Sequence, residues 1–177
     1  MHDLPPSLWV RRFAPLISAG GRVLDVACGA GRHARLLAGM GYRVEAVDRD
    51  PGTLAMLEGS PAITTSIADL ERDSWPYQVA SFDGVVVTNY LYRPRVGALI
   101  DVLKPGGVLI YETFMVGNET LGKPSNPDFL LHPSELLDRI RPRLTVVAFE
   151  QGRVDHPKAA FVQRICAVAA DVGLLPT

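Results

Sequence analysis

The chain has 177 residues, of which 47% are hydrophobic and 21% charged. This size and composition fit one globular domain and exclude a disordered or fibrous chain. Its 18 basic and 19 acidic side chains give a formal net charge of −1, which does not favour a nucleic-acid partner held by bulk positive charge. No apolar run approaches the ~18 residues of a membrane-spanning helix, and the first six residues lack the features of a signal peptide, so we expect a cytoplasmic protein without membrane contact.

Short β-branched runs alternate with helical segments along most of the chain. Apolar residues at helical spacing predict the helices, and runs of strand length such as 85–87 predict strands buried on both faces. In chain order the predicted elements are a strand over residues 22–27, a helix over 32–40, a strand over 43–48, a helix from 51, strands over 63–68 and 81–88, a helix over 96–103, a turn at 104–107, a strand over 108–113, a helix over 133–140, and strands over 144–149 and 160–168.

This alternation predicts an α/β fold: a single-domain, Rossmann-like, seven-stranded, mostly parallel sheet with helices on both faces. The last two predicted strands are joined by a loop alone, so we expect them to form a C-terminal antiparallel hairpin. In such a sheet the ligand crevice lies at the carboxyl ends of the parallel strands. The two cysteines, Cys28 and Cys166, form no ligand or disulfide spacing, and we expect no metal site.

A glycine-rich loop follows the first predicted strand. Ala27, Gly29 and Gly31 carry at most a methyl group, so a ligand can approach the backbone closely while the amides of the next helix point at it. Asp48 ends the second predicted strand and could accept hydrogen bonds from two ribose hydroxyls. The spacing Gly29-x-Gly31-x-x-Ala34 also satisfies the dinucleotide fingerprint, so a nicotinamide-dependent oxidoreductase stays an open alternative.

Two further acids favour a different ligand. Asp25 precedes Gly29 by four residues and could hold an ammonium group directly or through water, whereas it would repel a pyrophosphate. Asp69, at the end of the third predicted strand, offers a carboxylate for an adenine amine, and the backbone amide of Leu70 could reach a ring nitrogen. A zwitterionic ligand that carries an adenosine would use both sites.

With these motifs and the turn Leu103-Lys104-Pro105-Gly106-Gly107, the sequence resembles the class I S-adenosylmethionine-dependent methyltransferases over residues 20–113. It is similar to their small bacterial members of the tellurite-resistance and type 11–12 kinds. The resemblance implies S-adenosyl-L-methionine as the cofactor, with Ala27 where many members carry glycine. The residues that it implies for the cofactor are Asp25, Ala27, Gly29, Gly31, Asp48, Arg49, Asp69, Leu70 and Asn89.

The resemblance also implies a domain organisation, in which residues 1–177 form one methyltransferase domain with four segments. Residues 1–20 would form an N-terminal helix or lid and 21–113 the cofactor-binding core. Residues 114–132 would form a substrate loop, and 133–177 the C-terminal helix and hairpin.

The acceptor would meet the cofactor beyond the fourth and fifth predicted strands. Because the cofactor's sulfonium is already a strong electrophile, the protein's main task is alignment and exclusion of water, and we assign no catalytic residue. An acid such as Glu112 in an apolar strand is costly to bury unless it is paired or functional. We expect Trp9 and Phe13 as aromatic walls of the lid. The candidates for the substrate pocket are Tyr90, Tyr92, Glu112, Phe114 and His132.

We therefore expect methyl transfer from S-adenosylmethionine to a small-molecule acceptor. An anionic acceptor would suit residues 1–43, which hold six arginines and only two acidic residues. The alternatives are an NAD(P)-dependent oxidoreductase and a non-catalytic S-adenosylmethionine-binding regulatory protein. A nucleic-acid methyltransferase is less favoured, because the fourth strand is not followed by an Asn-Pro-Pro-Tyr tetrad and no basic domain is appended.

Overall fold

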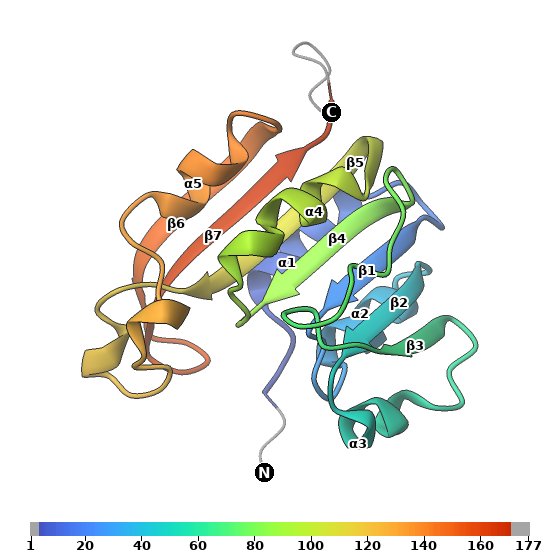
Figure 1. Cartoon of the computed structure of the whole chain (residues 1–177), viewed down its shortest axis with the longest axis horizontal. Coiled ribbons are helices and arrows are strands. Elements are labelled where there is room, and N and C mark those ends of the chain that lie inside the picture. Colours follow the sequence, from blue (N-terminus) through green and yellow to red (C-terminus); the bar gives the residue numbers. More distant parts are fainter. Residues whose placement is uncertain (1–3, 171–177) are drawn as a thin grey trace.

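A computed structural model describes residues 4–170, so the ends of the expected N-terminal and C-terminal segments, 1–3 and 171–177, lie outside the described residues. Residues 4–170 form one seven-stranded sheet in the order β3-β2-β1-β4-β5-β7-β6 (Figure 1). Neighbouring strands from β3 to β5 run parallel, and β7 runs antiparallel to both β5 and β6, as predicted. The strands are β1 (Arg22–Val26), β2 (Arg43–Asp48), β3 (Ile63–Ile67), β4 (Phe82–Thr88), β5 (Leu103–Phe114), β6 (Thr145–Val154) and β7 (Ala160–Val168).

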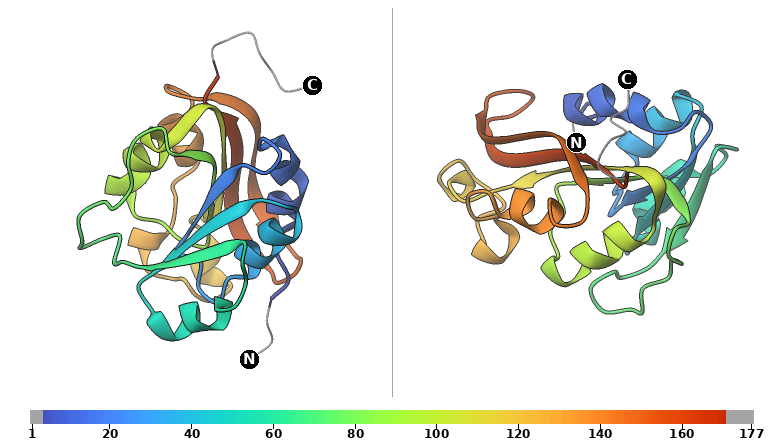
Figure 2. Two further views of the ribbon diagram at one scale, coloured as in Figure 1. Left: turned by 90° about the vertical axis from the view of Figure 1, so that its right-hand side faces the viewer. Right: turned by 90° about the horizontal axis from the view of Figure 1, so that it is seen from above.

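Helices cover both faces of the sheet (Figure 2). Successive residues of β4 point to opposite faces, so Val85 and Val87 pack in one core cluster with Leu99, while Val86 packs in the other with Leu37. One face carries α1 (Leu8–Phe13), α2 (Arg32–Gly39) and α3 (Pro51–Leu54), and the other carries α4 (Val96–Asp101) and α5 (Glu135–Ile140). Single 3-10 turns lie at Ala14–Leu16, Ala55–Leu57, Arg93–Arg95, Asn118–Thr120 and Pro127–Phe129.

The turn predicted at residues 104–107 is wrong, because these residues belong to β5. The register shows why the sequence suggested a turn. Phe82 pairs with Leu103, but Gly84, two residues further along β4, already pairs with Val108, so β5 bulges out between the two pairs. Gly106 has a φ of +79° within the bulge, which glycine adopts without steric cost. The Pro-Gly-Gly signal therefore marks an irregularity inside a strand.

Trp9 and Phe13 do not form a lid wall and are core residues of α1. Only 3% and 7% of their surfaces are exposed, and their ring centroids lie 4.5 Å apart. The indole N–H of Trp9 donates a hydrogen bond to the Ile165 carbonyl of β7 at 3.2 Å. The helix begins at a cap in which Ser7 Oγ accepts from the backbone N–H of Trp9. The aromatic pair thus fastens α1 to the sheet.

A Trp9→Ala variant should lower the free energy of unfolding by about 3–5 kcal/mol, because it opens a cavity and leaves the Ile165 carbonyl without its donor. Trp9→Phe should cost less, since it keeps most of the packing. Urea unfolding of both variants measures the difference. A Trp9→Ala variant as stable as the parent would contradict the core role.

Candidate active site

The loop between β1 and α2 is held in a left-handed conformation at three of its five residues. Ala27, Gly29 and Gly31 have φ values of +50°, +52° and +75°. Glycine adopts this region freely, whereas alanine is strained there. The backbone N–H of Gly29 donates to Asp48 Oδ2 at 2.8 Å and ties the loop to the end of β2. The loop and the Asp48 carboxylate therefore form one rigid unit.

The two glycines of this loop serve different purposes. A Cβ at Gly29 would meet no atom within 4 Å, so this side of the backbone is open to a ligand. A Cβ at Gly31 would lie 2.3 Å from Cδ2 of the buried Leu57. Gly31 is thus required for packing, and Gly29 leaves space at the surface of the loop.

Asp25, the penultimate residue of β1, carries a buried carboxylate without a partner. It is 1% exposed, and neither of its oxygens has a hydrogen-bond partner among the described residues. Burial raises the pKa of Asp25 to about 7, and the negative charge of Asp48 adds to the shift. The nearby backbone amide of Ala34, which is not within hydrogen-bonding geometry of the carboxylate, and the charge of Arg32 oppose it. A buried polar group in this condition suits a cation or a ligand-bound water.

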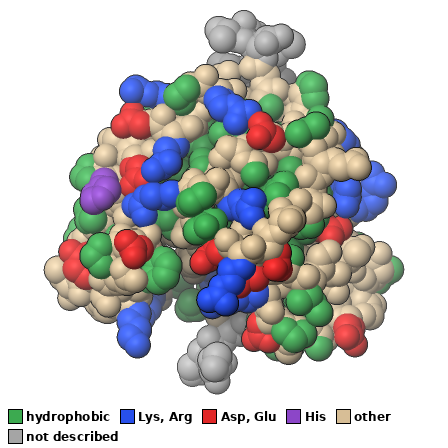
Figure 3. All heavy atoms as spheres, in the orientation of Figure 1, with side chains coloured by type: hydrophobic (Ala, Val, Ile, Leu, Met, Phe, Trp, Pro, Cys, Tyr) green, Lys and Arg blue, Asp and Glu red, His purple; other side chains and the backbone are tan. Residues whose placement is uncertain are grey.

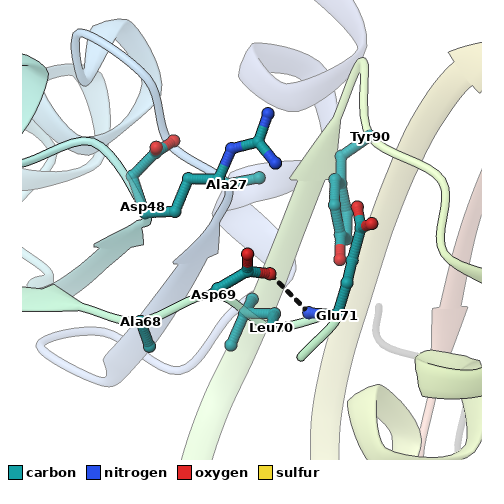
Figure 4. A pocket seen from close by; sticks show the side chains of 8 residues that line it. Ala27, Asp48, Ala68, Asp69, Leu70, Glu71 and Tyr90 are labelled. Atoms are coloured by element: carbon teal, nitrogen blue, oxygen red, sulfur yellow. Dashed lines mark hydrogen bonds between the residues drawn. The ribbon is translucent and has the colours of Figure 1, made fainter. Parts of the chain in front are cut away.

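A first cavity of about 270 Å³ opens where β1, β2 and β3 end (Figure 4). Asp48 points its carboxylate with a fixed orientation, because Oδ1 accepts from the backbone N–H of Asp50 and Oδ2 from that of Gly29. The cavity is lined by Ala27, Asp48, Arg49, Ala68, Asp69, Leu70, Glu71 and Tyr90.

Asp69, Glu71 and Tyr90 form another part of the wall of the first cavity. Asp69 Oδ1 accepts the backbone N–H of Glu71 at 3.0 Å, the bond drawn in Figure 4. The Tyr90 side chain stands beside that of Glu71 (Figure 4), and its hydroxyl is buried without a partner among residues 4–170. The wall therefore offers a carboxylate and an unused hydroxyl beside the apolar side chain of Leu70.

A second cavity of about 220 Å³ lies at the end of β5. It is bounded by the segment before α1, the loop after β5 and the turn between β6 and β7. Asn89 lines the second cavity, whereas its neighbour Tyr90 lines the first, so the loop after β4 separates the two. Asn89 has a φ of +54°, and its backbone N–H donates to the Glu112 carbonyl. Asparagine adopts this left-handed conformation more readily than most residues, and it places consecutive residues of the loop at two different cavities.

A chain of polar contacts ties the N-terminal segment to the ends of β4 and β5. Ser7 Oγ donates to Glu112 Oε1 at 2.8 Å, and Arg164 Nη1 donates to Glu112 Oε2 at 3.2 Å. The backbone N–H of Ser7 donates to His33 Nε2 at 3.0 Å, so Nδ1 carries the imidazole proton and donates to Thr88 Oγ1 at 3.1 Å. Burial, with a smaller effect of a neighbouring cation, lowers the pKa of His33 to about 3. The imidazole is therefore a neutral structural link.

The structure brings together most of the residues that the sequence singles out. Of those expected at the cofactor, five line the first cavity: Ala27, Asp48, Arg49, Asp69 and Leu70. Asn89 lines the second cavity, and Asp25, Gly29 and Gly31 belong to β1 and its loop without lining either. Of the substrate candidates, Tyr90 lines the first cavity, Glu112 and Phe114 line the second, and Tyr92 and His132 line neither.

Tyr92 and His132 have other surroundings. Tyr92 is the N-cap of the turn Arg93–Arg95. Both polar groups of the His132 backbone are hydrogen-bonded: its N–H donates to Glu135 Oε2, and its carbonyl accepts from Gln163 Nε2.

Sequence reasoning did not find the residues that border the second cavity from distant parts of the chain. These are Ser7, Lys123, Lys158 and Arg164. Each is an ordinary polar residue in its local sequence. Only the pairing of β5 with β7 and the path of the N-terminal segment bring them together. No spacing in the sequence predicts this arrangement.

Comparisons with known proteins agree with this fold and this loop. Residues 23–107 match the family model described as a methyltransferase domain. A ubiquinone biosynthesis O-methyltransferase of Xanthomonas axonopodis pv. citri is 34% identical over 123 residues, which cover 64% of this chain and 51% of that protein. A tRNA U34 carboxymethyltransferase of Methylococcus capsulatus is 32% identical over 117 residues, which cover 60% of this chain and 35% of that protein.

Solved structures show the same architecture. A protein from Methanosarcina mazei, described as a S-adenosylmethionine-dependent methyltransferase, superposes with a TM-score of 0.71 at 16% identity and covers 94% of this chain and 99% of its own. TehB from Haemophilus influenzae superposes with a TM-score of 0.72 at 20% identity and covers 90% of this chain and 60% of its own.

Residues 23–107 therefore match a methyltransferase domain, and the chain has the fold of solved S-adenosylmethionine-dependent methyltransferases. It spans about half the length, or less, of the curated relatives that it matches. The segment that matches the family model, residues 23–107, includes the glycine-rich loop, β2 and all of β1 but its first residue.

Gly29→Ala and Gly31→Ala should separate ligand access from packing. Gly29→Ala should destabilise by only about 1 kcal/mol, the cost of a left-handed alanine, but should weaken binding of S-adenosylhomocysteine at least tenfold by filling the open side of the loop next to the first cavity. Gly31→Ala should cost about 2–4 kcal/mol, because left-handed strain adds to the clash with Leu57. Urea unfolding and calorimetric titration with S-adenosylhomocysteine measure both. Equal stability losses would contradict the assignment.

Asp25 and His33 should have opposite effects on stability between about pH 4 and 6.5. Folding holds a proton on Asp25 that the unfolded chain releases, so this group lowers stability as the pH rises toward 7. His33 stays neutral in the folded protein, whereas the unfolded chain binds a proton at this residue below about pH 6.5. This group therefore raises the stability of the fold as the pH rises over the same range. The two effects oppose each other in the parent protein.

Asp25→Asn removes one side of this balance. The stability of the variant relative to the parent should rise by about 1.4 kcal/mol per pH unit from pH 4.5 to 6.5. Urea unfolding at several pH values checks this. Parallel stability curves for variant and parent would show that Asp25 titrates normally in the folded protein.

Proposed function

We propose that the protein transfers a methyl group from S-adenosylmethionine to a small-molecule acceptor. The observation that carries the proposal is the rigid unit of the glycine-rich loop and Asp48 at the first cavity. Gly29 leaves the backbone open on one side, and its N–H fixes the carboxylate of Asp48. The unpartnered buried carboxylate of Asp25 lies beneath the same loop.

The residues present suit the parts of this cofactor. Asp48 would accept the ribose hydroxyls, since its two oxygens are already oriented by backbone amides. Asp69 and the backbone amide of Leu70 would hold the adenine. Asp25 would compensate an ammonium group, directly or through water, which supplies the partner that its buried carboxylate lacks. A dinucleotide pyrophosphate offers no cation to this buried carboxyl group and would leave it without a partner, which counts against the oxidoreductase alternative.

The bound cofactor supplies an electrophilic methyl group, and the residues of the chain align the acceptor and exclude water. Asn89 lines the second cavity, next to Tyr90 at the first, so the acceptor would approach the methyl group from the second cavity. Phe114 and Leu8 offer apolar surface there, which would displace water around the reacting groups. Glu112 would orient the acceptor and not remove a proton, because Ser7 and Arg164 already engage both of its oxygens. This open second cavity favours an enzyme over a non-catalytic binding protein.

A small molecule fits these features better than a nucleic acid. On the face shown in Figure 3, acidic and basic side chains are interspersed and form no continuous basic stripe for a phosphate backbone. One relative acts on a tRNA by its name, so transfer RNA belongs among the acceptors to be tested. None of the helices within residues 4–170 is both long and apolar enough to cross a membrane. The cytoplasmic location expected from the sequence stays a prediction.

Calorimetric titration with S-adenosylhomocysteine, S-adenosylmethionine and NADH tests the cofactor. We expect micromolar binding of the first two and none of NADH. Asp48→Ala should weaken S-adenosylhomocysteine binding at least tenfold, because it removes a charge-assisted acceptor for two hydroxyls.

Asp138→Ala is the matched control, since this exposed aspartate lies on α5 and pairs with Arg141. It should bind S-adenosylhomocysteine as the parent does. Binding of NADH in place of S-adenosylhomocysteine would overturn the proposal in favour of the oxidoreductase.

A further inference from the structure

The wall of the second cavity carries an excess of positive charge. Four side chains with permanent positive charge line it, and Glu112 is the only carboxylate among the described residues that do so. Glu112 is itself neutralised, since Arg164 Nη1 lies 3.2 Å from its Oε2. The four cationic side chains are Arg32, Lys123, Lys158 and Arg164.

Three of these cations, Arg32 and the two lysines, have no carboxylate partner among the described residues. Arg32 Nη1 donates to the Pro5 carbonyl, which carries no charge, whereas Arg164 also pairs with Glu150 at 2.8 Å. By contrast, no carboxylate within residues 4–170 lies within 4.0 Å of the ammonium groups of Lys123 or Lys158. These lysines come from the loop after β5 and the turn between β6 and β7, so the fold adds two uncompensated cations to that of Arg32 on one cavity.

The rest of the wall is mostly apolar. Leu4 and Leu8, before and at the start of α1, are 43% and 73% exposed and present apolar surface at the rim of the cavity. Phe114 and Val162, from adjacent strands, continue the apolar surface inward. A cavity with an apolar wall and a few convergent charges is the common form of a small-molecule site.

We propose that the second cavity binds a compact molecule with an apolar body and an anionic group, a carboxylate or a phosphate. Lys123 and Lys158 hold the anionic group, and the leucines with Phe114 cover the body. That this molecule is the methyl acceptor rests on the proposed function, whereas its binding does not. A volume of about 220 Å³ admits a compact ligand of this kind and no folded segment of a macromolecule.

The polar groups of the cavity agree with an anionic ligand. Both oxygens of Glu112 are engaged, by Ser7 and by Arg164, so this carboxylate is not available as a base. An acceptor that binds as an anion brings no proton that such a base would have to remove. A cavity that carries positive charge and no free carboxylate therefore suits a ligand that is already ionised.

Binding is tested on the protein alone and again in the presence of excess S-adenosylhomocysteine, whose own binding is measured separately. The probes are benzoate and phenyl phosphate, each with substituted aromatic analogues, and the neutral partner of each benzoate is the corresponding benzamide. We expect anionic probes to bind at least tenfold more tightly than the benzamides, with an affinity that falls as salt is added. The benzoate and phenyl phosphate series distinguish a carboxylate from a phosphate site.

The double variant Lys123→Met/Lys158→Met removes both charges and keeps the apolar stems. It should weaken the anionic probes roughly tenfold or more and leave the benzamides unchanged. Arg11→Met is the matched control, because this exposed arginine of α1 does not line the cavity. It should leave both probe classes unaffected.

The outcomes separate the two proposals. If S-adenosylhomocysteine binds but no anionic probe binds more tightly than its neutral partner, the anion site is wrong and the proposed function stands. If anionic probes bind through the two lysines while S-adenosylhomocysteine does not bind, the anion site stands and the cofactor assignment is wrong. Anion binding that survives the double variant, or tight binding of transfer RNA that the double variant abolishes, would overturn the inference.

Discussion

The left-handed turn at residues 27–31 is the constraint on which the rest of the site depends. It lets the chain leave β1 and enter α2 within five residues, and the bond from Gly29 to Asp48 fixes the neighbouring strand end to it. The turn lies where the strand order reverses between β1 and β4, which is the place where open α/β sheets form their crevices. Ala27 takes part in this turn at a steric cost that glycine would not have. A strained residue in the loop is consistent with a conformation set by function and not by stability alone.

Ser7 contributes to three structures at once. Its hydroxyl caps α1 and donates to Glu112, and its backbone N–H donates to His33. The segment before α1 is therefore held against the ends of β4 and β5 and supplies one wall of the second cavity. Because His33 is buried and neutral, this attachment does not change with pH in the physiological range. The second cavity thus has a fixed wall on the N-terminal side and lysines on its more exposed side.

The sequence alone predicted the fold well and the first cavity in large part. Both follow from local rules: buried runs such as 85–87 fix the strands, glycines fix the turn, and acids at strand ends such as Asp48 and Asp69 fix the crevice. The second cavity obeys no such rule, because its residues are separated by up to 160 positions, from Leu4 to Arg164, and meet only after β5 pairs with β7. Local reasoning also misjudged Trp9, since an aromatic residue of an amphipathic helix gives the same pattern over a core as over a ligand.

A net charge near zero conceals how the charges are distributed between the two cavities. The first is lined by three acids and one arginine, and the second by four cations and one neutralised acid. A ligand with a positive centre and one with a negative group would each be attracted to a different cavity, and Asn89 and Tyr90 form the boundary between them. Because opposite charges attract more strongly where water is excluded, such an arrangement would favour a cationic donor and an anionic acceptor meeting at that boundary. The composition gives no sign of this separation, because it depends on where the fold places each charge.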